Sequence, residues 1–185
     1  MLSELLNKKH TKNFWVYDAD KNGYVEKADL ELCALNLALL RGWEPGMPEF
    51  EDLSAKYAAI WQKFWQPADL NGDGKVELED YLTVAEKSIA NFPNSAELQE
   101  AHDAKASIIF SILDADSNGT ISLDEYKQFC KAVQLDEDIS EVAFAKLDQN
   151  GDGVISSEEY LERSKEFHTS DDPNIPGNWL YGSYE

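Results

Sequence analysis

Positive charge is scarce in this chain: 16 lysine and arginine residues stand against 36 aspartate and glutamate residues, for a formal net charge of −20. Proteins bind nucleic acids through basic surfaces that neutralise the phosphates. The charge balance therefore excludes nucleic acid as an ordinary partner. It also disfavours docking on an anionic membrane.

Long apolar runs are missing too. No segment approaches the ~20 apolar residues that span a bilayer, and the amino-terminal stretch MLSELLNKKH lacks the apolar core of a secretory signal. Residue 2 is leucine rather than glycine, so the pattern for N-myristoylation is absent. We expect no stable membrane association.

Only two cysteines occur, Cys33 and Cys130, and both fall on apolar faces of expected helices. Cysteines in such positions are usually buried free thiols that pack like small apolar side chains. Free thiols suit a reducing compartment. The prediction is a cytoplasmic protein without disulfides.

Catalytic patterns are absent as well. The chain contains neither a nucleophile elbow nor a phosphate-binding loop, and its three histidines, His10, His102 and His168, lie in no motif. We predict that the protein is not an enzyme and has no catalytic residues and no organic cofactor site. Its 185 residues, 43% of them hydrophobic, are enough for one domain or two small lobes.

What the chain does contain is a twelve-residue pattern repeated four times, beginning at Asp18, Asp69, Asp114 and Asp148. Each copy has Asp at position 1, Asp or Asn at positions 3 and 5, and Gly at position 6. A hard divalent cation takes about six to eight oxygen ligands, which alternate side chains around a tight glycine turn supply. The pattern predicts four EF-hand loops, each able to bind one calcium ion.

The loops span residues 18–29, 69–80, 114–125 and 148–159 and are numbered 1 to 4 here. Their ligands should come from positions 1, 3, 5, 9 and 12 and from the backbone carbonyl of position 7. In loops 1 and 2 these are Asp18, Asp20, Asn22, Tyr24, Glu26 and Asp29, and Asp69, Asn71, Asp73, Lys75, Glu77 and Asp80. In loops 3 and 4 they are Asp114, Asp116, Asn118, Thr120, Ser122 and Glu125, and Asp148, Asn150, Asp152, Val154, Ser156 and Glu159.

Position 12 divides the four loops. Loops 3 and 4 have Glu there, as bidentate calcium binding requires, whereas loops 1 and 2 have the shorter Asp29 and Asp80. A shorter acid favours the smaller, six-coordinate arrangement of magnesium, while Glu26 and Glu77 at position 9 add charge. We therefore interpret loops 1 and 2 as mixed magnesium and calcium sites and loops 3 and 4 as calcium sites. The alternative for each loop is an empty one kept for packing.

Apolar residues recur at helical spacing on both sides of every loop, which predicts an all-α EF-hand fold of four helix–loop–helix units. Such a unit cannot bury its apolar face alone, so the units should pack in pairs. We expect residues 1–92 to form an N-terminal pair and residues 93–169 a C-terminal pair. Position 8 of each loop is β-branched, which favours a short strand pairing between partner loops: Val25, Val76, Ile121 and Ile155.

Three further segments have a predicted place. Residues 41–48 are rich in Gly and Pro and should form a turn between long helices. Residues 91–94 should join the two halves, with Ser95 capping the next helix. Residues 170–185 form a tail too apolar to be free in solution, and we expect it to fold back into the cleft between the halves.

The composition also separates two kinds of calcium-binding protein. A calcium sensor opens a methionine-rich groove for target helices, and this chain has only two methionines, Met1 and Met47. It has instead 21 aromatic residues (8 Phe, 8 Tyr and 5 Trp), which fill a fixed core better than an adaptable groove. This balance favours a calcium buffer.

Chain length, the long interval between loops 1 and 2, the helix with Trp61, Phe64 and Trp65, and the tail sequence SDDPNIPGNWLYG resemble the invertebrate sarcoplasmic calcium-binding proteins, with calexcitin-like relatives included. The resemblance implies a compact cytosolic protein that buffers calcium and holds magnesium at rest in some sites. That family often has one disabled loop, whereas all four loops here keep positions 1, 3, 5 and 6. We expect a monomer whose partners are calcium and magnesium ions, and no protein target is indicated.

Two alternatives remain at this point. The first is a calexcitin-like calcium sensor. The second, more remote, is a photoprotein or luciferin-binding relative, because His168, Trp179 and Tyr184 loosely resemble that family's ring of His, Trp and Tyr. The chain ends in Glu185 and not in the proline that this second resemblance requires.

Overall fold

The computed structural model is mostly helical and describes all residues except 136 and 184–185. Its helices are α1 (Glu4–Tyr17), α2 (Lys27–Arg41), α3 (Pro48–Ile60), α4 (Leu78–Asn91), α5 (Ala96–Leu113), α6 (Leu123–Ala132), α7 (Glu137–Leu147) and α8 (Ser157–Thr169). Its strands are β1 (Tyr24–Glu26), β2 (Lys75–Glu77), β3 (Thr120–Ser122) and β4 (Val154–Ser156). The predicted EF-hand fold class is confirmed. Within the described residues, no helix is long and apolar enough to cross a membrane.

The strands pair as the β-branched residues predict. β1 runs antiparallel to β2 with Val25 opposite Val76, and β3 runs antiparallel to β4 with Ile121 opposite Ile155. All four of these side chains are buried. Each pairing therefore joins two loops back to back and fixes position 7, whose carbonyl is an expected ligand, at the start of a strand.

Side chains of the loops cap the first turns of the helices that follow loops 1, 3 and 4. In α6 and α8 the cap serine and the glutamate three residues later exchange hydrogen bonds, as Ser122 with Glu125 and Ser156 with Glu159. In α2 the Asp29 carboxylate accepts the Glu26 N–H at 2.9 Å. Position 12 of these loops thus serves both the loop and the first turn of the following helix.

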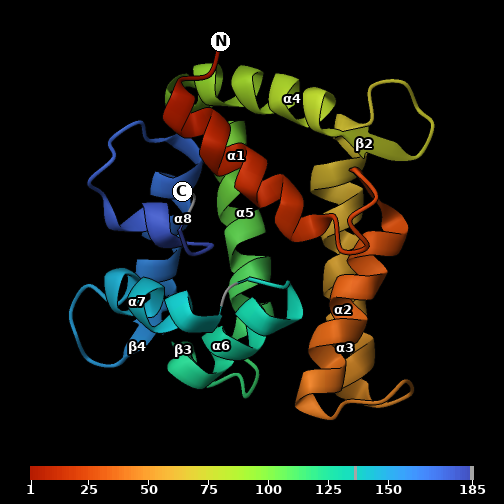
Figure 1. Cartoon of the computed structure of the whole chain (residues 1–185), viewed down its shortest axis with the longest axis vertical. Coiled ribbons are helices and arrows are strands. Elements are labelled where there is room, and N and C mark those ends of the chain that lie inside the picture. Colours follow the sequence, from red (N-terminus) through yellow and green to blue (C-terminus); the bar gives the residue numbers. More distant parts are fainter. Residues whose placement is uncertain (136, 184–185) are drawn as a thin grey trace.

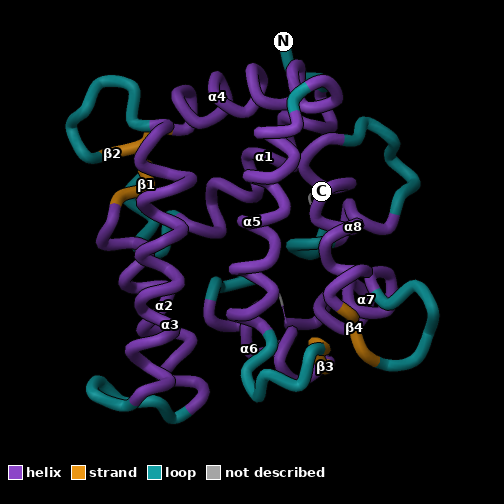
Figure 2. The backbone as a smooth tube through the Cα atoms, turned by 180° about the vertical axis from the view of Figure 1, so that it is seen from behind, coloured by secondary structure: helices purple, strands orange, loops and turns teal. Residues whose placement is uncertain are grey.

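The arrangement of the helices is seen from two sides in Figures 1 and 2. α2 and α3 form a helical hairpin along one side, α5 runs through the middle, and α1 and α4 lie together at one end. The predicted turn between long helices is confirmed, since α2 ends at Arg41 and α3 begins at Pro48, with Gly42 in the left-handed region at φ 70°. The two strand pairs lie at opposite corners of the molecule.

A continuous apolar core runs through both halves of the chain. α2 contacts α6, and α3 contacts α5. Two cations from the α2–α3 hairpin also hold the last turn of α5: Arg41 donates to the carbonyls of Ile112 at 2.8 Å and Leu113 at 3.1 Å, and Lys56 donates to that of Ser111 at 3.0 Å. These carbonyls have no partner within α5, and Asp114 of loop 3 follows directly.

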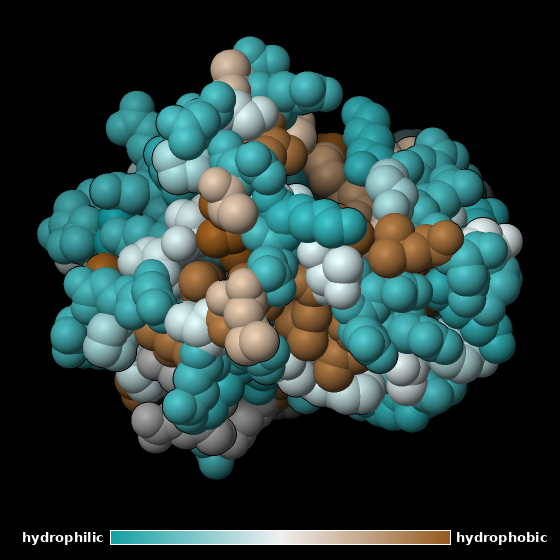
Figure 3. Space-filling view, turned by 90° about the horizontal axis from the view of Figure 1, so that it is seen from above, coloured by the Kyte–Doolittle hydropathy of each residue, from teal (hydrophilic) through white to brown (hydrophobic). Residues whose placement is uncertain are grey.

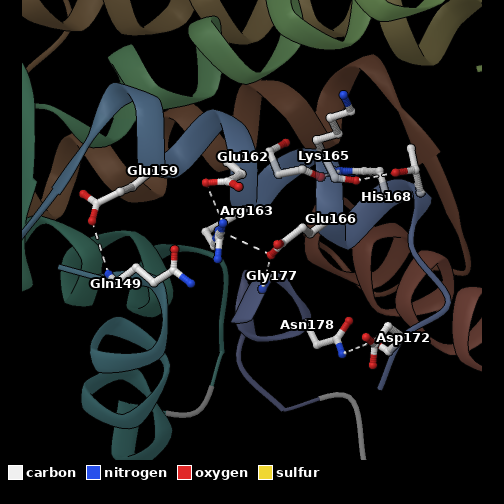
Figure 4. A network of polar contacts seen from close by, with 12 residues as sticks. Gln149, Glu159, Glu162, Arg163, Lys165, Glu166, His168, Asp172, Gly177 and Asn178 are labelled. Carbon is white, nitrogen blue, oxygen red and sulfur yellow. Dashed lines mark hydrogen bonds and ion pairs between the residues drawn. The ribbon is translucent and has the colours of Figure 1, made fainter. Parts of the chain in front are cut away.

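The described part of the tail folds against α1, α7 and α8. Pro176–Trp179 forms a short 3₁₀ turn, Leu180 and Tyr181 are buried, and Trp179 is only partly buried. In the close view of Figure 4, the Gly177 N–H donates to Glu166 on α8 at 2.9 Å. Glu166 in turn lies 3.3 Å from Nε of Arg163.

Lys9 of α1 holds the same segment from the other side. Its side chain is fully buried, and Nζ donates to the backbone carbonyls of Glu166 at 3.3 Å and Ser170 at 2.7 Å. A third hydrogen bond, of 3.0 Å, goes to Oδ1 of Asn178. Three oxygens therefore surround the ammonium group, although burial still lowers the pKa of Lys9 to about 8.

Figure 3 looks onto the α1–α4 end, where hydrophilic side chains surround a smaller area of apolar surface.

Candidate metal centres

Position 1 is built the same way in all four loops. One oxygen of each Asp carboxylate accepts the backbone N–H of the Gly at position 6, at 3.0 Å in loops 1 and 3, 2.8 Å in loop 2 and 2.9 Å in loop 4. That glycine has φ between 88° and 99° in every loop, a conformation that residues with a Cβ rarely adopt. The sharp turn therefore points the first expected ligand into the loop.

Position 5 fixes the next turn. The side-chain oxygen of Asn22, Asp73, Asn118 or Asp152 accepts the backbone N–H two residues later, at 2.8–3.1 Å. This local hydrogen bond is the typical use of Asn and Asp in turns. The residue held in this way is position 7, whose backbone carbonyl is the next expected ligand.

Position 12 distinguishes loop 2 from the other three. Asp29 accepts N–H groups from Ala19 and Asp20, Glu125 accepts one from Ala115, and Glu159 accepts two from residues 149 and 150. The second oxygen of each accepts the N–H of position 9. Within the described residues, Asp80 of loop 2 accepts no hydrogen bond at all. The short Asp29 thus reaches the interior of loop 1, whereas Asp80 does not reach that of loop 2.

Two loops bring three carboxylates together. Oxygens of Asp18, Asp20 and Asp29 lie within 4.8 Å of one another in loop 1, and those of Asp114, Asp116 and Glu125 do so in loop 3. Such oxygen donors are what calcium and magnesium prefer. Unit charges about 4 Å apart repel by about 4 kcal/mol at an effective dielectric of 20, so a divalent cation between them would remove a large repulsion.

The clustering reflects two versions of the loop that differ at positions 3, 4 and 5. Loops 1 and 3 have Asp at 3 and Asn at 5, whereas loops 2 and 4 have Asn at 3 and Asp at 5. Position 4 has a positive φ in all four, but it is Gly72 or Gly151 in loops 2 and 4 and Lys21 or Ser117 in loops 1 and 3. The prediction from the sequence grouped the loops by position 12 and missed this alternation at positions 3 to 5, although the sequence itself contains it.

The pKa values of two position-12 acids move in opposite directions. Burial raises the pKa of Asp29, and hydrogen bonds from backbone N–H groups offset it only in part. In Glu159 burial also raises the pKa, but hydrogen bonds from Ser156, Asn150 and Gln149 outweigh it and leave the pKa below its usual value. Asp29 is therefore the acid whose ionised form depends more on a nearby cation.

The remaining candidate residues lie away from the loops. Cys33 and Cys130 are both buried, as predicted, and no disulfide joins them; burial raises the pKa of Cys33 to about 12. His168 lies on α8 and Trp179 in the tail, while Tyr184 falls outside the described residues. The structure also brings His10, His102 and His168 together, which no local pattern had indicated.

Comparison with known proteins gives a consistent result. A family model of the EF-hand domain pair matches residues 61–131 and 103–165. The chain is similar to the sarcoplasmic calcium-binding protein beta chain of Penaeus sp., with 27% identity over 69% of this chain and 67% of the relative. It is also similar to sarcoplasmic calcium-binding proteins I, III and IV of Branchiostoma lanceolatum, with 26% identity over 69% of this chain and 68% of the relative.

Solved structures show the same fold. The calcium-loaded apo form of the coelenterazine-binding protein from Renilla muelleri matches with a TM-score of 0.80 at 22% identity, covering 98% of this chain and 99% of that one. A sarcoplasmic calcium-binding protein from amphioxus matches with a TM-score of 0.75 at 22% identity, covering 99% of both chains. At this identity the likeness concerns the fold alone.

Proposed function

Since the chain belongs to the EF-hand family, we propose that it binds calcium in its four loops and serves as a calcium and magnesium buffer in the cytoplasm. The resemblance to sarcoplasmic calcium-binding proteins drawn from the sequence is confirmed by the relatives. The observation that carries calcium binding is the position-1 carboxylate that the glycine N–H anchors in every loop, together with the three carboxylates that cluster in loops 1 and 3. The 24 ligands expected from the sequence are proposed as the site residues.

The shared core supports a buffer over a sensor. Sensor EF-hands open to expose an apolar groove when calcium binds, while buffer EF-hands barely open. Here the apolar faces of residues 1–92 and 93–169, which we propose as the two pairs, already contribute to one core. Leu180 and Tyr181 of the tail are 2% and 1% exposed. Little apolar surface between the halves is left for a target helix, and we assign the protein no catalytic step.

Magnesium enters the proposal through loop 1. Asp29 is contracted onto the loop and its carboxylate lies close to two others, which suits the smaller ion with its shorter ligand distances. Within the described residues, Asp80 at position 12 of loop 2 accepts no hydrogen bond. We therefore propose that loop 2 binds metal ions most weakly.

Two alternative functions remain beside the buffer. The first, a calexcitin-like sensor, would require the tail to leave α8 when calcium binds. A luciferin-binding role has the Renilla fold likeness in its favour, but Tyr184 of the suggested ring lies outside the described residues. Neither alternative changes the proposed ligands.

A calcium titration by calorimetry in millimolar magnesium tests the proposal. Wild type should bind up to four calcium ions, and Glu125→Gln and Glu159→Gln should each remove one. The matched control is Glu158→Gln, which removes the same charge at the exposed neighbouring position and should leave the stoichiometry unchanged. Equal stoichiometry in all four proteins would refute the site assignment. A calcium-dependent rise in apolar dye binding would refute the buffer role and favour the sensor.

A further inference from the structure

All three histidines of the chain gather around one cavity outside the four loops. They come from distant helices: His10 from α1, His102 from α5 and His168 from α8. The His168 ring lies 5.8 Å from that of His10 and 5.7 Å from that of His102, measured between centroids. The cavity has a volume of about 180 Å³, and we call it the histidine cavity.

The walls of the histidine cavity are mostly apolar. α4 and its flanking segments supply a large share of them, and the residues include Phe64, Ala85, Ile89, Phe92 and Leu98. An engineered apolar cavity of roughly 150 Å³ binds benzene. The histidine cavity therefore has room for one aromatic ring with short substituents.

One hydrogen-bond acceptor in this wall has no partner. Nδ1 of His168 lies 2.8 Å from the Ser164 carbonyl, which can only accept, so Nδ1 carries the proton. Burial lowers the pKa of His168 well below its usual value, so Nε2 is an unprotonated acceptor. Nε2 is buried and contacts no donor in the described protein, and the residue is only 9% exposed.

The other two histidines are already satisfied. His10 contacts the Tyr81 hydroxyl through Nδ1 at 3.1 Å and the His168 carbonyl through Nε2 at 3.0 Å. His102 contacts Asp103 at 3.1 Å and Ser164 Oγ at 3.2 Å. Among contacts with the described residues, Nε2 of His168 is thus the one histidine nitrogen of the cavity that has no partner. An unsatisfied buried acceptor is unfavourable until a donor reaches it.

A cation without a counter-ion completes the wall. Nζ of Lys105 lies 6.0 Å from the centroid of the Phe64 ring, at a distance typical of a cation–π contact. No carboxylate of the described chain pairs with it, and burial alone lowers the pKa of Lys105 to about 8. At neutral pH this lysine remains mainly charged, so it favours an anion.

We propose that the histidine cavity binds a small aromatic acid that carries a hydroxyl group, with its ring against the apolar walls, its carboxylate facing Lys105 and its hydroxyl donating to Nε2 of His168. This ligand would be separate from the metal ions, because no expected ligand residue lines the cavity. The cavity nonetheless borders loop 2, since Ala68 and Tyr81 directly precede and follow residues 69–80.

Three one-ring probes separate the contributions on the calcium-loaded, full-length protein. 4-Hydroxyphenylacetate has both polar groups, phenylacetate lacks the hydroxyl, and 4-methylphenol lacks the carboxylate. We expect saturable one-to-one binding of 4-hydroxyphenylacetate by NMR titration, with broadening of the His168 ring signals. Phenylacetate should bind roughly fivefold more weakly and 4-methylphenol at least about tenfold more weakly, because hydrogen bonds to charged groups are the stronger ones.

The matched variants are Lys105→Met and Lys87→Met. Lys105→Met should weaken 4-hydroxyphenylacetate by about tenfold and leave 4-methylphenol unchanged. Lys87 lies on α4 but is exposed to solvent, so Lys87→Met should change neither. Absence of saturable binding, equal affinity for the three probes, or an equal effect of both variants would overturn the proposal. The probe series needs no variant, so the test stands even if Lys105→Met fails to fold.

Discussion

Gln134, between α6 and α7, donates a hydrogen bond of 3.1 Å from its side chain to the backbone carbonyl of Ala19 in loop 1. The N–H of the same Ala19 donates to Asp29 at 3.0 Å. Ala19 therefore links Gln134, in the C-terminal half, to Asp29, the position-12 acid of loop 1. Gln134 holds this position with a positive φ of 57°, which is unfavourable for a residue with a Cβ.

Substituting Gln134 separates the hydrogen bond from the backbone strain. Gln134→Ala should lower the free energy of unfolding by about 1 kcal/mol, because the hydrogen bond is lost. Gln134→Gly loses the same bond but accepts the positive φ, so it should be more stable than Gln134→Ala by roughly 1–2 kcal/mol. Urea denaturation measures both, with exposed Gln62→Ala as control. An Ala variant as stable as the control would show that the bond contributes nothing.

Lengthening the acid at position 12 should act differently in loops 1 and 2. The sequence alone predicts that Asp29→Glu and Asp80→Glu both raise the preference for calcium. In the structure Asp29 is 2% exposed and both its oxygens are bound, so the extra methylene should cost roughly 1–3 kcal/mol of stability. Asp80 makes no such contacts with the described residues, and Asp80→Glu should reach the ion and raise calcium affinity.

Calcium titrations in millimolar magnesium, with thermal melts of the same samples, distinguish these two outcomes. Asp29→Asn and Asp80→Asn serve as controls that remove the charge without adding length. Equal gains in calcium affinity for both Glu variants would contradict the difference that the structure shows.

The tail is sensitive to a single added carbon at Gly177. A Cβ there would lie 2.5 Å from Cβ of Glu166 and 2.6 Å from the carbonyl oxygen of Arg163, too close to be accommodated without a shift. We expect Gly177→Ala to lower stability by roughly 1–3 kcal/mol and to increase apolar dye binding. Calcium affinity should change little, because no loop ligand is touched. The control is Pro173→Ala at an exposed tail position; unchanged melting of Gly177→Ala would argue against a docked tail.

Acid should destabilise the protein through His10. Burial lowers the pKa of His10 from 6.5 to about 4, with smaller contributions from the charges of Lys105 and Lys9. Below pH 6.5 the unfolded chain takes up a proton that the folded chain does not bind until about pH 4, so stability falls over this window. Between pH 7 and pH 5, wild type should lose roughly 2 kcal/mol more than His10→Gln.

The comparison of wild type with His10→Gln cancels the titration of the loop carboxylates, which both proteins share. Urea unfolding at each pH gives the difference directly. Parallel pH profiles for the two proteins would mean that His10 is not the group responsible.

The sequence predicted those parts of the structure that local chemistry decides. The position-6 glycine, the oxygens at positions 1 and 5 and the β-branched position 8 act within one loop or across one strand pair, so their placement follows from spacing. The turn at residues 41–48 and its Gly42 are local in the same sense. These features required no knowledge of how the helices pack.

The parts that were missed depend on contacts between distant segments. His10, His102 and His168 share no motif, and only the packing of α1, α5 and α8 brings them together. The position of Asp80 depends on α4, whose first turn carries Tyr81 stacked on Trp65 at 4.9 Å between ring centroids. Trp65 itself belongs to a π-helical turn, Trp61–Trp65, that helical spacing alone does not predict.

The contact between Lys9 and the tail has a consequence for the order of folding. Lys9 and its acceptors, the carbonyls of Glu166 and Ser170 and the side chain of Asn178, are separated by 157, 161 and 169 residues along the chain. Closing so long a loop costs chain entropy before the contact can form, and contacts of this kind slow folding. We therefore expect the burial of Lys9 to be completed late in folding, after the strand-paired loops have formed.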